Sequence, residues 1–106
     1  MSKMDLPDQY VNVRNKYKEL MGALDNLGDV VTHQGPIDEK SSHLIRMAAA
    51  VAIRSEGAVH SHARRALQSG ATPEEVNHAV ILLTSTIGFP TVSAALTWVD
   101  DILEGK

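Results

Sequence analysis

Apolar residues recur at spacings of three and four along most of the chain, a pattern that predicts helices rather than strands. A first helix is predicted between Pro7, which suits a helix start, and Gly28, which suits a left-handed helix end. A second helix is predicted from Asp38, as its N-cap, to about Arg54. Because residues 44–53 are apolar on almost every side, this helix is expected to be buried at the centre of the fold.

Glycine and proline mark the helix ends in the second half of the chain. A third helix is predicted over about residues 57–69, and Gly70 closes it. Thr72-Pro73-Glu74-Glu75 has the pattern of a capping box with proline at the first helical position, so a fourth helix begins there. This helix continues to a break at Gly88-Phe89-Pro90, and a fifth helix follows and ends before Gly105.

The length of the chain and its apolar composition limit the architecture. The 106 residues show no repeat or internal boundary, so we expect one all-α domain over residues 1–106, a compact bundle of about five helices. Hydrophobic residues make up 43% of the chain but aromatic residues only 4%, so small aliphatic side chains must form the core. A domain this short with strongly apolar helices is expected to complete its burial as a homo-oligomer.

Charge and cysteine content exclude several function classes. The formal net charge of −3 leaves no basic surplus for binding nucleic acid. The first nine residues lack an apolar signal core, and the longest apolar run, residues 47–53, is too short to cross a bilayer. The chain has no cysteine, so disulfides, thiolate nucleophiles and cysteine metal sites are excluded. We expect a cytoplasmic protein with no membrane partner and no cofactor.

The third predicted helix carries two histidines that cannot act together. With Val59 at the centre of the apolar stripe, His60 and His62 lie about 200° apart around the helix, on opposite shoulders. They therefore do not form a helical metal pair, and no metal site is predicted from them. His62 is either a boundary histidine packed beside the core or a general acid-base, because imidazole titrates near neutral pH.

Other polar residues could complete a site around His62. His43 begins the buried part of the second predicted helix, where it either hydrogen-bonds a neighbouring loop or lines one pocket together with His62. Arg46 interrupts the same helix and needs a partner, for which a helix end, a bound anion or Glu56 are candidates. Glu56 could also pair with His60, four residues later on one helix face.

Ser55 and the pair Arg64-Arg65 have simpler interpretations beside their functional ones. No glycine-flanked elbow surrounds Ser55, so it is predicted to cap a helix rather than to act as a nucleophile. The two arginines are predicted to lie on a solvated face. Arg64 is also a candidate to hold a carboxylate, because the guanidinium fork matches the two oxygens of that group.

Three segments carry a resemblance to a known superfamily. They are His43-Leu44-Ile45-Arg46-Met47-Ala48-Ala49-Ala50-Val51-Ala52, His62-Ala63-Arg64-Arg65-Ala66-Leu67 with Gly70-Ala71-Thr72-Pro73-Glu74-Glu75-Val76, and Gly88-Phe89-Pro90 before an alanine-rich helix. In order and spacing, they resemble the carboxymuconolactone decarboxylase and alkylhydroperoxidase D-like superfamily over Ser42–Leu103. The resemblance implies an all-α fold that assembles into trimers or hexamers.

The redox branch of this superfamily uses two cysteines three residues apart and a histidine four residues after the second. Taking His62 as that histidine places the cysteine positions at Ser55 and Ala58. The glutamate of the branch's proton relay falls at His43. Because the chain has no cysteine, thiol peroxidase chemistry of the peroxiredoxin type is excluded.

The decarboxylase branch also lacks the cysteines and is the nearer functional relative, although the glutamate that it usually carries four residues before the histidine is Ala58 here. We therefore expect a lyase that acts on a small organic acid or lactone. Its expected catalytic residues are His62, His43 and Glu56, and its expected substrate-binding residues are Arg46, Arg64, Ser55 and His60. The alternative is a non-catalytic oligomeric member of the family that binds a small molecule or has a structural role.

Overall fold

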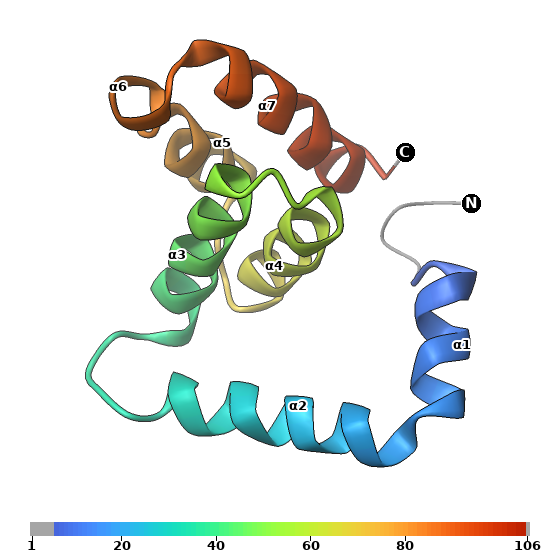
Figure 1. The fold of residues 1–106 in the computed structure, drawn as a ribbon. Helices are drawn as coiled ribbons and strands as arrows, with labels where there is room; N and C mark the ends of the chain where they lie inside the picture. The colour runs from blue at the N-terminus through green and yellow to red at the C-terminus, as the bar shows by residue number, and fades with distance from the viewer. Residues whose placement is uncertain (1–5, 106) are drawn as a thin grey trace.

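The structure is a computed structural model, and it describes residues 6–105. All regular elements in this range are helices (Figure 1). They are α1 (Asp8–Lys16), α2 (Lys18–Thr32), α3 (Glu39–Ala52), α4 (Glu56–Gln68), α5 (Pro73–Ile81), α6 (Thr84–Ile87) and α7 (Phe89–Leu103). None of the helices in this part of the chain is both long enough and apolar enough to cross a membrane. The all-α prediction is confirmed.

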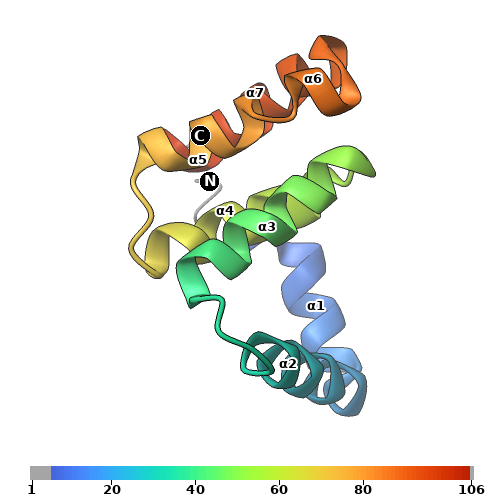
Figure 2. The ribbon, with the colours of Figure 1, turned by 90° about the vertical axis from the view of Figure 1, so that its left-hand side faces the viewer.

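Helices α3 to α7, which we call the body, pack around one hydrophobic core. Figure 2 shows α3 and α4 as a central layer, with α5 and α7 on one side of it. Valine and alanine dominate this core, as the scarcity of aromatic residues predicts. Its fully buried members include Met47, Val51, Val59, Ala63, Ala66, Val76, Val80, Val92, Ala95 and Val99.

Helices α1 and α2, which we call the arm, stand away from the body. Figures 1 and 2 show the arm as an L on the side of α3 and α4 that faces away from α5 and α7. Neither helix of the arm contains a buried residue. The arm also enlarges the molecule: the radius of gyration is 14.0 Å, whereas a compact domain of this length has a value of about 13 Å.

The prediction of a single first helix up to Gly28 is wrong in two respects. The helix is interrupted at Tyr17, whose φ of −120° and ψ of 60° are not helical, and α2 continues past Gly28 to Thr32. An ion pair between Arg14 of α1 and Asp25 of α2 favours the bend. In one straight helix these residues would lie about 16 Å apart along the axis, too far to pair.

The fourth predicted helix is likewise divided, into α5 and the short α6. Between them, the Thr84 hydroxyl donates a hydrogen bond to the carbonyl oxygen of Ile81 at 2.7 Å. A side-chain donor of this kind competes with the backbone ladder of the helix. Together, the two divisions raise the helix count from the predicted five to seven among residues 6–105.

The predicted N-caps Asp38 and Thr72 are confirmed. The Asp38 carboxylate accepts a hydrogen bond from the backbone N–H of Ser41 at 2.7 Å. At the start of α5, the backbone N–H of Glu75 donates to the Thr72 hydroxyl at 3.1 Å, and the Glu75 carboxylate accepts from the backbone N–H of Thr72 at 2.9 Å. This reciprocal pair is the predicted capping box.

The prediction that α3 is buried on all sides is wrong for the single chain. Ile45 is 54% exposed and Ile53, just after the helix, is 75% exposed. The body covers only one side of α3, and the arm does not close over the other side. The apolar positions on that side are therefore left to solvent.

Helices α3 and α4 end in the same motif, which sets the path of the chain at both turns. After α3, the N–H groups of Arg54 and Ser55 donate to carbonyl oxygens of the last turn at 3.0 and 2.9 Å. After α4, the N–H groups of Gly70 and Ala71 do the same at 3.1 and 2.9 Å. This is the Schellman arrangement, which requires a positive φ at the residue that directly follows the C-cap. The φ values are +57° at Arg54 and +102° at Gly70.

Alanine substitutions at the two glycines beside and within α4 should have opposite effects on stability. Gly70→Ala should lower the free energy of unfolding by about 1 kcal/mol, because an alanine is strained at positive φ. Gly57→Ala lies inside α4, where a new methyl group meets no atom within 4 Å, and should raise it by about 0.5–1 kcal/mol. Urea unfolding of both variants measures this difference, and equal effects would contradict the assignment of Gly70 as the helix end.

Candidate functional site

The turn between α3 and α4 brings His43 and His62 side by side. The two helices are joined by only three residues, 53–55, and they pack closely against each other. The ring centroids of His43 on α3 and His62 on α4 lie 5.8 Å apart, with an interplanar angle of 28°. Of the two sequence-based alternatives for His43, the structure therefore matches contact with His62 rather than contact with a loop.

His43 is buried, and His62 is half-buried. His43 is only 9% exposed. The Nδ1 atoms of both rings are buried and have no hydrogen-bond partner among the described residues. A buried polar atom without a partner carries a desolvation cost, so such atoms commonly mark a place where a ligand or water binds.

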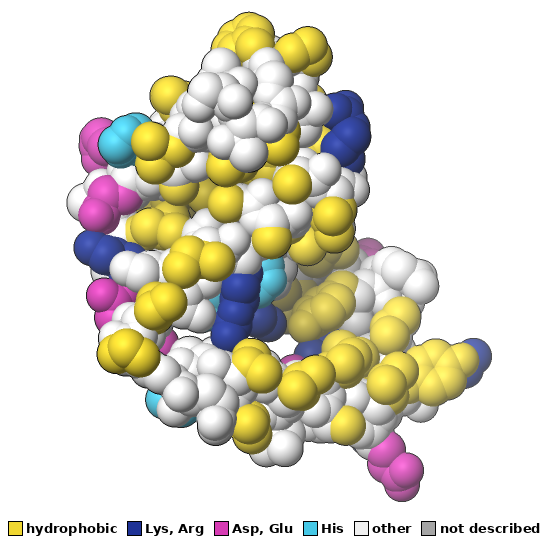
Figure 3. Space-filling view, turned by 60° about the vertical axis from the view of Figure 1, so that its left-hand side comes forward, with side chains coloured by type: hydrophobic (Ala, Val, Ile, Leu, Met, Phe, Trp, Pro, Cys, Tyr) yellow, Lys and Arg dark blue, Asp and Glu magenta, His cyan; other side chains and the backbone are white. Residues whose placement is uncertain are grey.

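A cavity of about 420 Å³, which we call the arm cavity, lies between the arm and the first part of the body. The body contributes Glu39, His43, Arg46 and Arg65 to its lining, and the arm contributes residues that include Tyr10 and Thr32. His62 is not part of the lining, but it stacks against His43, which is. Figure 3 shows the hollow between arm and body, with cationic and histidine side chains gathered beside it.

Only some of the charged side chains around the arm cavity form ion pairs. Its lining holds three arginines and three carboxylates: Arg14, Arg46, Arg65, Asp25, Asp29 and Glu39. Arg14 is engaged by its ion pair with Asp25. Arg46 donates a hydrogen bond to the Thr32 hydroxyl at 2.7 Å, and neither Arg46 nor Arg65 forms an ion pair within residues 6–105. Among residues 6–105, two guanidinium groups of the lining therefore form no ion pair, and the same holds for the carboxylates of Asp29 and Glu39.

Burial and these cations keep the histidine pair neutral. Burial lowers the pKa of His62 from its ordinary value of 6.5 to about 4, with further lowering by Arg65, His43 and Arg46. Burial also lowers the pKa of His43, again with help from Arg46 and Arg65. At neutral pH the pair is therefore unprotonated, and its member in the lining of the arm cavity, His43, presents a neutral imidazole there.

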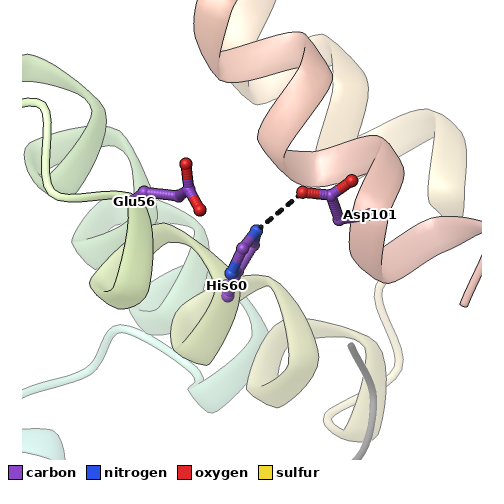
Figure 4. Close-up of side chains that lie close together, drawn as sticks. All are labelled: Glu56, His60 and Asp101. Atoms are coloured by element: carbon purple, nitrogen blue, oxygen red, sulfur yellow. Dashed lines mark hydrogen bonds and ion pairs between the residues drawn. The ribbon is translucent and has the colours of Figure 1, made fainter. Parts of the chain in front are cut away.

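His60 points to a different part of the molecule, as its helical position relative to His62 predicts. It is 7% exposed, and its Nε2 lies 3.2 Å from Oδ2 of Asp101 on α7 (Figure 4). Glu56 lies beside this pair, one helical turn before His60. The structure thus groups Glu56 with His60. Glu56 is not brought to His62, and the hydrogen-bond partner of Arg46 is Thr32, not Glu56.

Arg64 and Ser55 lie apart from the histidine pair. Arg64 lines a second cavity of about 330 Å³ with Tyr10, Ala58 and His60, and burial lowers its pKa. Ser55 occupies the N-cap position of α4, but its side chain makes no capping hydrogen bond. Ser55 is thus at the predicted cap position, but without the side-chain hydrogen bond of a cap. Ser55 also lines neither of the two cavities.

Sequence reasoning missed Arg65 and Asp101. Arg65 is three residues after His62 and so shares a helix face with it. This spacing indicates that Arg65 and His62 can share a site, although the simpler interpretation of the Arg64-Arg65 pair is a solvated face. Asp101 contacts His60 only because α7 packs against α4. The two residues are far apart in sequence, so no local pattern indicates this contact.

Comparison with known protein families assigns the chain. The family model for the carboxymuconolactone decarboxylase family matches residues 18–101. The chain belongs to the carboxymuconolactone decarboxylase family. The match begins at α2, so it includes most of the arm, which lies outside the region that carried the resemblance in sequence.

A solved structure supports the same assignment. A carboxymuconolactone decarboxylase family protein from Legionella pneumophila, crystallised in its apo form, is 28% identical in sequence and superposes with a TM-score of 0.75. The alignment covers 91% of this chain and 86% of that protein. A search of curated proteins finds no match.

This family member cannot use the thiol chemistry of the redox branch, because its 106 residues include no cysteine. The two positions that correspond to the cysteines, Ser55 and Ala58, also do not line the arm cavity. Ala58 lines the second cavity, on the His60 side of α4. The polar groups brought together in this chain are instead the histidine pair and the arginines beside it.

Acid should destabilise this protein through the histidine pair. The pKa of His62 lies near 4 in the folded state and near 6.5 in the unfolded state. Its contribution to the free energy of unfolding is therefore complete above pH 6.5 and is lost as the pH falls toward 4. Between pH 7 and pH 5, His62 alone should reduce the free energy of unfolding by about 2 kcal/mol. Urea unfolding at pH 7 and at pH 5 should show that the free energy of unfolding decreases less in His62→Gln than in the wild type. The exposed His78→Gln serves as control and should retain the wild-type slope.

Proposed function

We propose that this family member is a lyase that releases carbon dioxide from a small organic acid or lactone bound in the arm cavity. The observation that carries the proposal is the placement of two neutral, stacked imidazoles next to two guanidinium groups that form no ion pair within residues 6–105. An anion binds where cations lack partners, and a proton is transferred where imidazole nitrogens are available.

Arg46 and Arg65 are the proposed carboxylate ligands. Both line the arm cavity, and their charges lower the pKa of both histidines. A guanidinium group can hold a carboxylate through two parallel hydrogen bonds, which fixes its orientation as well as its position. This assignment replaces Arg64, which faces the second cavity.

Substrate binding and proton transfer are coupled through charge. A bound carboxylate offsets the positive charges of Arg46 and Arg65, so it raises the pKa of His43 and His62 and allows one of them to take up a proton. When the carbon–carboxylate bond breaks, carbon dioxide leaves and its bonding electron pair stays on the adjacent carbon. That pair is then quenched by the imidazolium proton, which returns the histidine to its neutral form.

The alternative is a non-catalytic binding protein, and one observation favours it. The glutamate expected four residues before the histidine is replaced by Ala58, and the nearby Glu56 lies with His60, not with the histidine pair. In that case the arm cavity would hold a carboxylate without converting it. Measuring binding and carbon dioxide release on the same samples separates the two functions.

We also propose that the chain assembles with copies of itself through the arm, as a trimer or hexamer in the cytoplasm. The 15 residues of α2 include none that is buried. Figure 3 shows hydrophobic side chains running along the arm. A stripe at helical spacing on α2 consists of the exposed residues Leu20, Leu24, Leu27 and Val31. Exposed apolar stripes of this kind are typical of protein–protein contacts.

Substitution of Arg46 or Arg65 by glutamine should weaken binding of small carboxylates by about tenfold, because each removes a charge-assisted hydrogen-bond donor. Calorimetric titration with a panel of small organic acids and lactones measures the effect. Arg54→Gln is the matched control, since this exposed arginine contacts Thr91 and lies outside the arm cavity. Equal affinities in all three variants would contradict the proposed binding site.

His43→Gln should retain carboxylate binding within a few-fold but lower carbon dioxide release by about 100-fold or more, because it removes the imidazole that lines the arm cavity. The rate is followed by trapping the released gas with the best-binding acid as substrate. A wild-type protein that binds this acid without releasing carbon dioxide would support the non-catalytic alternative.

Leu27→Glu should reduce the mass of the assembly measured by analytical ultracentrifugation, because it places a charge in the apolar stripe of α2. Asn26→Glu introduces the same charge at the neighbouring exposed position and should leave the mass unchanged. A monomeric wild-type protein would contradict assembly through the arm.

A further inference from the structure

Glu56, His60 and Asp101 form a cluster of metal-ligand type on the opposite shoulder of α4 from His62. Glu56 and His60 are four residues apart on α4, so they share one face, and Asp101 comes from α7. One potential ligand atom from each residue lies within 4.8 Å of those from the other two. Figure 4 shows both carboxylates beside the Nε2 edge of the His60 ring.

We propose that these three residues bind a divalent first-row transition-metal ion. Imidazole nitrogen together with two carboxylates is a donor set that suits Zn²⁺, Co²⁺ and Mn²⁺. The assignment differs from the pairing of His60 with His62 that the helical spacing argues against. It uses His60 with partners from its own helix and from α7.

The geometry requires only a small movement to hold an ion. Ligand atoms around a tetrahedral Zn²⁺ lie about 3.3–3.6 Å apart, as follows from metal–ligand distances near 2.1 Å. Oδ2 of Asp101 and Nε2 of His60 are already 3.2 Å apart. The remaining adjustment falls on Glu56, whose exposed side chain can rotate toward the other two.

The contact between His60 and Asp101 alone does not explain why Glu56 lies beside them. Glu56 forms no hydrogen bond or ion pair within residues 6–105, yet its carboxylate lies beside a second carboxylate at the same imidazole. Two carboxylates in proximity repel each other, and a cation between them removes that repulsion. The near-complete burial of His60 holds its ring in place as the fixed ligand.

The site would also be open to solvent on one side. His60 lines the second cavity of about 330 Å³, together with residues such as Tyr10 and Ser61. Three protein ligands leave at least one coordination position for water or a small anion. This site is separate from the histidine pair, so its presence does not depend on the proposed lyase activity.

The test is calorimetric titration of the untagged, chelator-treated full chain with ZnCl₂ and MnCl₂. We expect one ion per chain, with Zn²⁺ bound more tightly than Mn²⁺ in line with the general affinity order of these ions. Glu56→Gln and Asp101→Asn should each weaken Zn²⁺ binding by about tenfold or more, since each removes a direct ligand. Glu56 is exposed, so the first variant should fold normally.

Three matched variants control for other sites. Asp100→Asn changes the exposed neighbour of Asp101, His78→Gln removes an exposed histidine on α5, and His62→Gln alters the histidine pair. All three should keep the wild-type affinity for Zn²⁺. Absence of stoichiometric binding in the wild type would overturn the proposal, leaving a hydrogen-bond contact between α4 and α7. Equal affinity of Glu56→Gln and wild type would overturn it as well.

Discussion

The packing of α3 against α4 through small side chains is the constraint on which the rest of the structure depends. Ala50, Val51, Ala63 and Ala66 are buried between the helices of the body, and short side chains let helix axes approach closely. The three-residue turn with its positive φ at Arg54 makes the two helices antiparallel neighbours. His43 and His62 meet because of this arrangement, and on the opposite shoulder of α4, His60 is directed to α7.

Electrostatics at the site follow from that packing. Burial and the stacking of the two imidazoles disfavour a positive charge on both rings. The nearby Arg46 and Arg65 lower the pKa of each histidine further. The same arginines favour an anion in the arm cavity. A bound carboxylate and a protonated histidine therefore stabilise each other, which gives the cavity its proposed function.

The sequence predicts most of the body but little of the arm. The caps at Asp38 and Thr72 and the end at Gly70 are local signals, so both ends of α3 and α4 and the start of α5 lie close to where they were expected. The bend at Tyr17 is accompanied by a contact between Arg14 and Asp25, which no local pattern reveals. For the site, helical spacing separates His60 from His62, whereas the grouping of Glu56 with Asp101 depends on tertiary packing.

The most direct test of this account is a titration of the His62 and His43 rings by nuclear magnetic resonance, with and without a small carboxylate. The account predicts that His62 of the free protein titrates with a pKa of about 4, that the pKa of His43 is also lowered, and that the carboxylate raises both. Ordinary titration near pH 6.5 for both rings, unchanged by the carboxylate, would contradict it.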